Sequence, residues 1–297
     1  MKNISEINRN LDAIRQTRHI TNAMYLLSVS TMRKGLAQIG YNRSYMQRLC
    51  LTVLDILQKS PELHHPFLDG DDYSGKWDTA LFVIASDKSL CGAYNQNVAA
   101  AAEKQIRMTA EDGRETIVYT AGQKIAELLR GHGIEVYKNF DEASQYPSLA
   151  QAYRIAGEMI DIFRCGYVQD IYIVFTDYVS AAVQPVRVQR LLPLSAENFA
   201  YPKTTAACSA HMTYEPSVEA VLEKVVSQYM QGYIYGSLCN ALVCENMARM
   251  TAMQSATRNA DEMLKSLETA YNSARQLAIT GELTEIAAAT ELIQHSI

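Results

Sequence analysis

The sequence predicts an α/β protein in which a long antiparallel coiled coil of N- and C-terminal helices carries a central Rossmann-like α/β domain. All seven prolines lie between positions 61 and 216, so both ends of the 297-residue chain can form uninterrupted helices. At both ends apolar residues recur three and four positions apart, the spacing of a coiled-coil seam. Between them, short apolar runs alternate with helical segments, as in a mostly parallel sheet covered by helices. The expected segments are 1–60, 76–200 and 214–297.

The C-terminal helix is predicted to begin at Ser217, which is a good N-cap residue and follows Pro216. Glu219 falls in the first turn, where the helix dipole favours a negative charge. The apolar stripe comprises Leu222, Val225, Tyr229, Val243, Met247, Met250, Leu264, Leu267, Tyr271 and Ala274. A helix continuing to about residue 292 would be about 110 Å long at about 1.5 Å per residue, whereas a compact globule of this size is about 50 Å across. We therefore expect this helix to project or to lie against a partner.

The N-terminal helix is predicted to start at Asn3 or Ser5 and to stop before Pro61. Its stripe begins with Ile4, Ile7, Leu11 and Ile14. Further along, polar and small residues such as Thr21 take seam positions, which suits a contact that slides or changes. The N-terminal helix carries a net positive charge and the C-terminal helix a net negative one, so the two are electrostatically complementary.

The central segment reads as repeated strand–helix units. Strands are expected at 79–85, 116–119, 134–137, 170–175 and 184–192, and helices at 96–110, 122–130 and 148–164. The continuous apolar run at 79–85 is typical of a strand buried on both faces. The order of these elements predicts a mostly parallel sheet with helices on its faces.

This segment lacks the motifs of a nucleotide-binding enzyme. After the first expected strand the chain reads Ser86-Asp87-Lys88-Ser89-Leu90-Cys91-Gly92-Ala93-Tyr94-Asn95, without G-x-G-x-x-G, and no G-x-x-x-x-G-K-[ST] loop occurs. No motif supplies a base for Cys91, so a small buried thiol is expected there. Cys208 and His211 alone fall short of the four ligands of a closed zinc site. We expect no catalytic residue, no cofactor and no metal site.

Net charge, cysteine content and apolar run length narrow the possible functions and locations of the protein. The net charge of −5 disfavours non-specific nucleic-acid binding as a main role. Six scattered cysteines in a chain with no signal-peptide pattern indicate reduced cytosolic thiols. No apolar run is long enough to span a membrane. The absence of a transit pattern favours a bacterial source.

Specific residues then give the chain a family resemblance. The motifs are Thr17-Arg18-His19-Ile20-Thr21-Asn22-Ala23-Met24 with Met32-Arg33-Lys34, the turn from Ser86 to Asn95, Leu191-Leu192-Pro193-Leu194, Tyr214-Glu215-Pro216-Ser217, Ala248-Arg249-Met250-x-Ala252-Met253, Ala256-Thr257-x-Asn259-Ala260, Tyr271-Asn272-x-Ala274-Arg275-Gln276, and Ala278-Ile279-Thr280-x-Glu282-Leu283-Thr284-Glu285-Ile286. Over essentially its whole length the chain resembles the gamma subunit of F-type ATP synthase.

The resemblance implies a central-stalk rotor that performs no bond chemistry. The coiled coil would turn inside the hexamer of alpha and beta subunits, and the Rossmann-like domain would contact the epsilon subunit and the ring of c subunits. It would be peripheral to the cell membrane through the complex, on the cytoplasmic side, and would couple proton- or sodium-driven rotation to ATP synthesis. Arg275, Gln276 and Thr280 would bind loops of beta; Met24, Arg249, Glu282 and Glu285 would lie where rotation is coupled to catalysis.

The chain departs from the family pattern at several positions. His19 and Asn22 stand where lysines are common, Gly281 where glutamine is usual, and Ser89 and Ala93 replace glycines. Two other readings stay open on the sequence alone: a coiled-coil scaffold with no rotary role, and a Rossmann-like enzyme with helical arms. Binding of alpha, beta and epsilon would favour the rotor over the scaffold, and nucleotide binding by the isolated chain would favour the enzyme.

Overall fold

The computed structural model describes residues 4–60, 63–69, 75, 77–141, 143–194 and 214–294. Two long helices dominate it: α1 (Ile4–Lys59) and α6 (Val218–Gln294). The chain divides into two compact units, and both helices contribute to each. One unit contains the start of α1, up to Ser28, and the part of α6 from Met250 onward; the other is Val29–Arg249.

The unit from Val29 to Arg249 contains a five-stranded sheet. Its strands are β1 (Thr79–Ile84), β2 (Thr116–Ala121), β3 (Val136–Asn139), β4 (Asp170–Thr176) and β5 (Val186–Leu192). Their order is β3-β2-β1-β4-β5; β1 to β4 run parallel, and only β5 is antiparallel to its neighbour. The shorter helices are α2 (Pro66–Asp69), α3 (Tyr94–Glu111), α4 (Gln123–Gly131) and α5 (Leu149–Arg164). The predicted mixed α/β fold with long terminal helices is confirmed.

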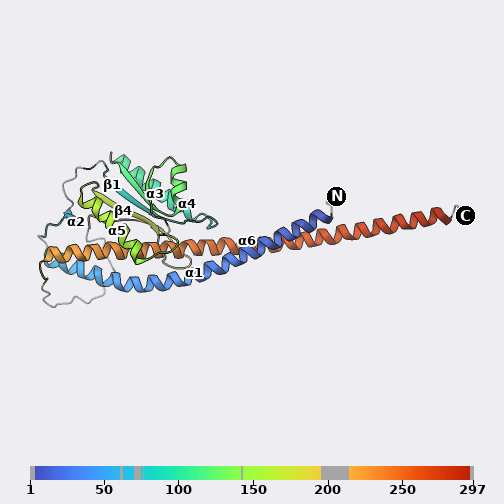
Figure 1. The fold of residues 1–297 in the computed structure, drawn as a ribbon, viewed down its shortest axis with the longest axis horizontal. Helices are drawn as coiled ribbons and strands as arrows, with labels where there is room; N and C mark the ends of the chain where they lie inside the picture. The colour runs from blue at the N-terminus through green and yellow to red at the C-terminus, as the bar shows by residue number, and fades with distance from the viewer. Residues whose placement is uncertain are drawn as a thin grey trace. The chain divides into compact units, whose positions relative to one another are not determined.

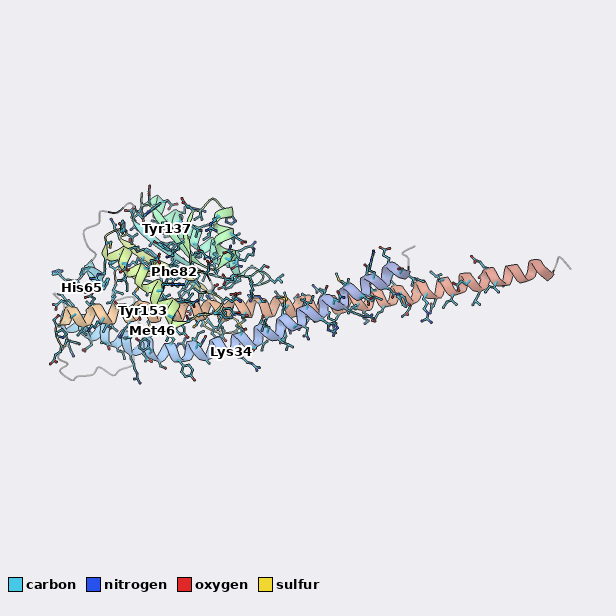
Figure 2. All side chains as sticks on the ribbon, viewed as in Figure 1. Lys34, Met46, His65, Phe82, Tyr137 and Tyr153 are labelled. Carbon is cyan, nitrogen blue, oxygen red and sulfur yellow. The ribbon has the colours of Figure 1, made fainter. Side chains whose placement is uncertain are left out.

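Helices cover both faces of this sheet (Figure 1). All six residues of β1 are buried, because β1 is the central strand and packs on both sides. Phe82 points into the layer that α5 shares with Met46 of α1 and with Tyr229 of α6; Figure 2 labels Phe82 and Met46. The neighbouring Leu81 and Val83 point to the opposite layer, against α3 and α4. The alternation follows from the pleat of a strand.

Two strands begin two residues later than predicted. β5 begins at Val186, whereas 184–192 was expected. β3 begins at Val136, whereas the apolar pattern favoured 134–137. Gly133 has φ +81°, and the amide of Ile134 donates to the carbonyl oxygen of Leu129 at 3.0 Å. Ile134 therefore belongs to the turn that ends α4, where the hydrogen bond back to the helix takes precedence over strand pairing.

Within the same unit, α1 and α6 pack closely through glycines. A Cβ atom at Gly236 would lie 2.4 Å from Nδ2 of Asn42, and one at Gly232 would lie 2.5 Å from Sδ of Met46. A Cβ atom at Gly35 of α1 would lie 2.6 Å from Val243. A Cβ atom at any of these positions would require the facing side chain, or the helix that carries it, to move.

In the unit that contains the start of α1 and the part of α6 from Met250 onward, the two helices run antiparallel. Thr21 and Thr257 hydroxyls lie 2.8 Å apart, and Arg18 pairs with Asp261. Nearer the start of α1, Arg15 Nη2 lies 3.7 Å from Glu268 Oε1. These ion pairs are about half exposed, so each contributes at most about 1 kcal/mol. They agree in sign with the charge complementarity read from the sequence.

The start of α6 follows the predicted cap. The amide of Ala220 donates to Oγ of Ser217 at 3.2 Å, and the helix begins at Val218. The pKa of Glu219 is lowered, chiefly by a hydrogen bond from its own main chain and then by Ser217. This is the stabilisation of negative charge expected in a first turn.

Candidate functional site

Five of the seven residues singled out from the sequence lie on one stretch of α6. Every residue from 275 to 287 is exposed, including Arg275, Gln276 and Thr280. The same stretch contains Glu282 and Glu285. Thr280 Oγ1 donates to the main-chain carbonyl oxygen of Gln276 at 2.8 Å, a bond inside the helix. The charged and amide groups of this stretch thus face solvent in the described chain.

Large apolar side chains are exposed along the same stretch. They are Leu277, Ile279, Leu283 and Ile286, exposed by 45–63%. At about 100° per residue, Ile279, Leu283 and Ile286 fall within about 60° on one face. An exposed apolar stripe on a helix indicates a surface that another protein covers.

The remaining two predicted residues, Met24 and Arg249, differ in their surroundings. Met24 is half-buried on α1, and its carbonyl oxygen accepts a hydrogen bond from Ser28 at 2.9 Å. Arg249 is only 7% exposed, although an arginine facing a partner would be expected at the surface. It belongs to the unit that holds the sheet. The structure thus brings five of the seven residues together and places Arg249 inside the chain's own packing.

Arg249 makes three polar contacts. Its Nη2 lies 2.5 Å from Oε1 of Glu245, one helical turn earlier, and donates to the carbonyl oxygen of Ser89 at 3.5 Å. Its Nη1 donates to Oδ1 of Asn246 at 3.4 Å. Burial raises the pKa of Glu245, while Arg249 opposes that rise by favouring the carboxylate. The sequence analysis did not single out Glu245. The one feature in the sequence that could have indicated this ion pair is that Glu245 stands four residues before Arg249.

The turn after β1 is held by Asp87. Its Oδ1 accepts from the amide of Gln123, the first residue of α4, and its Oδ2 accepts from the hydroxyl of Ser144, each at 2.8 Å. A helix N-terminus next to the carboxyl end of a strand is where related folds bind phosphate. Here the chain's own carboxylate already bonds the amide at the start of α4.

Cys91 is a buried thiol, as predicted. It is 2% exposed, and its sulfur lies 3.5 Å from Asn95 Nδ2 and 3.7 Å from Ser86 Oγ. Burial is the largest cause of its raised pKa, so the reactive thiolate is disfavoured. The second cysteine considered as a ligand, Cys208, lies with His211 outside the described residues. Across the residues that are described, no group of three or more His, Cys, Asp or Glu is placed to hold a metal ion.

Comparison with known proteins decides the family. A family model described as ATP synthase matches residues 3–292. The ATP synthase gamma chain of Ruminiclostridium cellulolyticum is 36% identical over 287 residues, covering 96% of each chain. That of Lachnoclostridium phytofermentans is 32% identical over 297 residues, covering 99% of this chain and 100% of the relative. The chain belongs to the ATP synthase gamma chain family.

Solved structures share the gamma-chain fold. A chain of the Euglena gracilis mitochondrial ATP synthase, in a structure of its OSCP, F1 and c-ring, gives a TM-score of 0.62 at 13% identity and covers 98% of this chain and 94% of its own. One from the central stalk and c-ring of Tetrahymena thermophila gives 0.58 at 22% identity, covering 80% and 99%. In the described part of this gamma chain, no helix is both long and apolar enough to cross a bilayer.

Proposed function

We propose that this gamma chain is the central-stalk rotor of an F-type ATP synthase. It would couple rotation of a c-ring, driven by protons or sodium ions, to ATP synthesis in a hexamer of alpha and beta subunits. The observation that carries the proposal is the exposed stretch 275–287 on the uninterrupted helix α6, whose apolar and charged side chains face solvent together. A surface of that kind on a single helix favours contact with a partner.

The gamma chain itself would perform no bond chemistry; the catalytic sites would lie on the beta subunits. An asymmetric helical pair that turns inside the hexamer presents a different face to each beta subunit in succession. Each site is then biased between conformations of different nucleotide affinity, by no more than the difference in contact free energy between those conformations. The contacts made by the exposed stretch therefore set how much free energy the rotor can transmit.

Arg275, Gln276 and Thr280 would supply the polar contacts to loops of beta. A guanidinium suits carboxylates of such loops because it donates in a fixed fork. Glu282 and Glu285 would extend this contact along the same helix, and Met24 would face the hexamer from α1. Arg249 is buried, so in our proposal it would act through its contacts within the gamma chain.

The remaining partners would be the epsilon subunit and the c-ring. Contact with them would fall to the α/β domain. The gamma chain would thus be held at the cytoplasmic side of a bacterial cell membrane, peripherally and only through the complex.

Single-molecule rotation tests the proposal. Cys165 is exposed, while Cys50, Cys91, Cys239 and Cys244 are buried. With Cys208 changed to serine, Cys165 accepts a biotin–maleimide on the α/β domain. The complex of alpha, beta and this gamma chain is immobilised through its hexamer, and a gold rod is attached to Cys165.

We expect the rod to rotate in one direction when ATP is added, and to stop when ATP is removed. ATP hydrolysis by the complex with a stationary rod would contradict the rotor and favour a static scaffold. Failure of alpha and beta from the same genome to assemble with the chain would contradict the proposed function altogether.

A further inference from the structure

The carboxyl edge of the sheet contacts α6 over a short segment. Tyr94 Oη donates to the carbonyl oxygen of Ala241 at 3.1 Å. The amide of Tyr178, in the turn after β4, donates to Oδ1 of Asn240 at 3.2 Å. In Rossmann-type folds this edge is the place where ligands bind. Here the residues that follow β1 and β4 are bonded to a helix of the same chain.

The contact made by Arg249 differs from those of Tyr94 and Tyr178, because it involves a buried ion pair. Arg249 reaches the carbonyl oxygen of Ser89 while paired with Glu245, and the two side chains are only 9% and 8% exposed. A buried ion pair stabilises a fold only when its geometry is good, and removing one partner leaves a charge without compensation. Replacing such a pair by apolar residues is often neutral, so stability alone does not explain why charged groups occupy this place.

The turn that Arg249 reaches has an unfavourable conformation of its own. Leu90 has φ +66°, a region that L-residues other than asparagine and aspartate seldom adopt, and its side chain is 55% exposed. A backbone of this kind persists only where its surroundings hold it. The next residue in the chain, Cys91, is 2% exposed.

We infer that Arg249 is a positioning residue that ties the turn 86–91 to α6 and fixes the α/β domain on that helix. Glu245 orients the guanidinium, and the carbonyl oxygen of Ser89 is what it holds. Tyr94 and Tyr178 complete the attachment on the same side of the sheet. The attachment is a property of the chain by itself. Its consequence for the rotor rests on the proposed function: torque entering at the α/β domain would pass to α6 through this contact.

The thiol of Cys91 reports whether the turn is held. In the full-length chain, labelling by N-ethylmaleimide is followed for each cysteine by mass spectrometry. We expect Arg249→Met to label Cys91 at least about tenfold faster than wild type, because labelling requires local opening of the turn. The remaining Glu245 carboxylate raises the pKa of Cys91, so the altered charge alone would slow labelling. Cys50, which is 2% exposed on α1, serves as the internal control and should keep its rate.

A second variant separates positioning from stability. Glu245→Met combined with Arg249→Met removes both buried charges and should recover folding if Arg249→Met alone folds poorly. We expect Cys91 still to label about tenfold faster, because the hold on Ser89 is gone. Labelling of Cys91 at the wild-type rate in this double variant would overturn the inference. So would equal acceleration at Cys50, which would mean general loosening.

The matched control is another arginine that joins the α/β domain to α6. Arg164 Nη1 lies 2.9 Å from Glu223 Oε1, with both side chains about half exposed. Arg164→Met should leave Cys91 labelling within about twofold of wild type, since exposed pairs contribute little. Acceleration equal to that of Arg249→Met would show that any domain-to-helix ion pair has the same effect.

In the assembled complex, the double variant should lower the ions pumped per ATP hydrolysed by at least about half. Hydrolysis and pumping that fall in proportion would contradict transmission of torque through this contact. If the wild-type chain does not assemble with alpha and beta, the proposed function fails, and the labelling experiment still decides the role of Arg249.

Discussion

The side chain of Asn42 on α1 donates a hydrogen bond from Nδ2 to the main-chain carbonyl oxygen of Gly232 on α6, at 3.0 Å. The same nitrogen faces Gly236, where a Cβ atom would lie only 2.4 Å away. One polar side chain in a helix–helix seam can thus specify a single register, because a shift of the helices would break this bond.

We expect Gly236→Ala to destabilise the chain by about 1–2 kcal/mol. Overpacking costs about 1–3 kcal/mol, and the better helix propensity of alanine returns up to about 1 kcal/mol. Urea unfolding followed by circular dichroism measures the change. Gly157→Ala is the control: a Cβ atom at this position of α5 meets nothing within 4 Å, so that variant should be equally stable or slightly more stable. A neutral Gly236→Ala would show that Asn42 can move without cost.

Gly281→Ala should strengthen the exposed part of α6. A Cβ atom at Gly281 meets nothing within 4 Å, and alanine is favoured over glycine in a helix interior by about 1 kcal/mol. We expect amide exchange between residues 277 and 285 to slow by up to about fivefold, with no change in β1. Exchange as fast as in wild type would mean that the backbone of Gly281 already behaves like that of any other helix residue.

Arg275→Ala combined with Gln276→Ala should leave the isolated chain folded, because both side chains are exposed. In the complex we expect ATP turnover to fall at least about threefold, or assembly to weaken, as polar contacts with beta are lost. Lys104→Ala combined with Arg107→Ala, both exposed on α3, is the matched control. Coupled turnover equal to wild type would count against the assignment of Arg275 and Gln276.

Asp87→Ala should lower the stability of the Val29–Arg249 unit by about 1–2 kcal/mol. The change removes the acceptor of the Gln123 amide at the start of α4 and that of the Ser144 hydroxyl. Thermal unfolding provides the measurement, and Glu135→Ala, an exposed carboxylate in the same unit, provides the comparison. Equal melting temperatures for the two variants would refute the capping role of Asp87.

The contact between Tyr214 and Asp55 should give a pH-dependent contribution to stability. Tyr214 Oη donates to Asp55 Oδ2 at 2.6 Å, and this bond is the largest cause of the lowered pKa of Asp55, followed by Lys59. Because the pKa is lower in the folded chain, the contribution is present above the unfolded pKa and is lost as pH falls through the folded pKa. Burial, and then the same contact, raise the pKa of Tyr214 to about 12, so the phenol stays protonated at neutral pH.

Tyr214→Phe should therefore reduce stability at pH 7 and have a smaller effect below the folded pKa of Asp55. Denaturant unfolding across the acid range, compared with wild type, measures this difference. A difference that stays constant with pH would mean that Tyr214 acts through packing alone.

The sequence alone determined the long helices, the buried central strand and the family resemblance. Proline positions, three-four spacing and continuous apolar runs are local signals, and they found α1, α6 and β1 within a few residues. β3 was misplaced by two residues because Ile134 completes the turn of α4, a competition between two hydrogen bonds that the apolar pattern does not record.

Only the tertiary structure decided which polar residues face inward. Arg249 and Arg275 both read as charged residues on the same helix, yet the first is buried against the sheet edge and the second is exposed. The register set by Asn42 and Gly232, and the carboxylate of Asp87 at α4, likewise join residues far apart in the chain. Periodicity describes the faces of one element, whereas burial and pairing depend on which second element lies opposite.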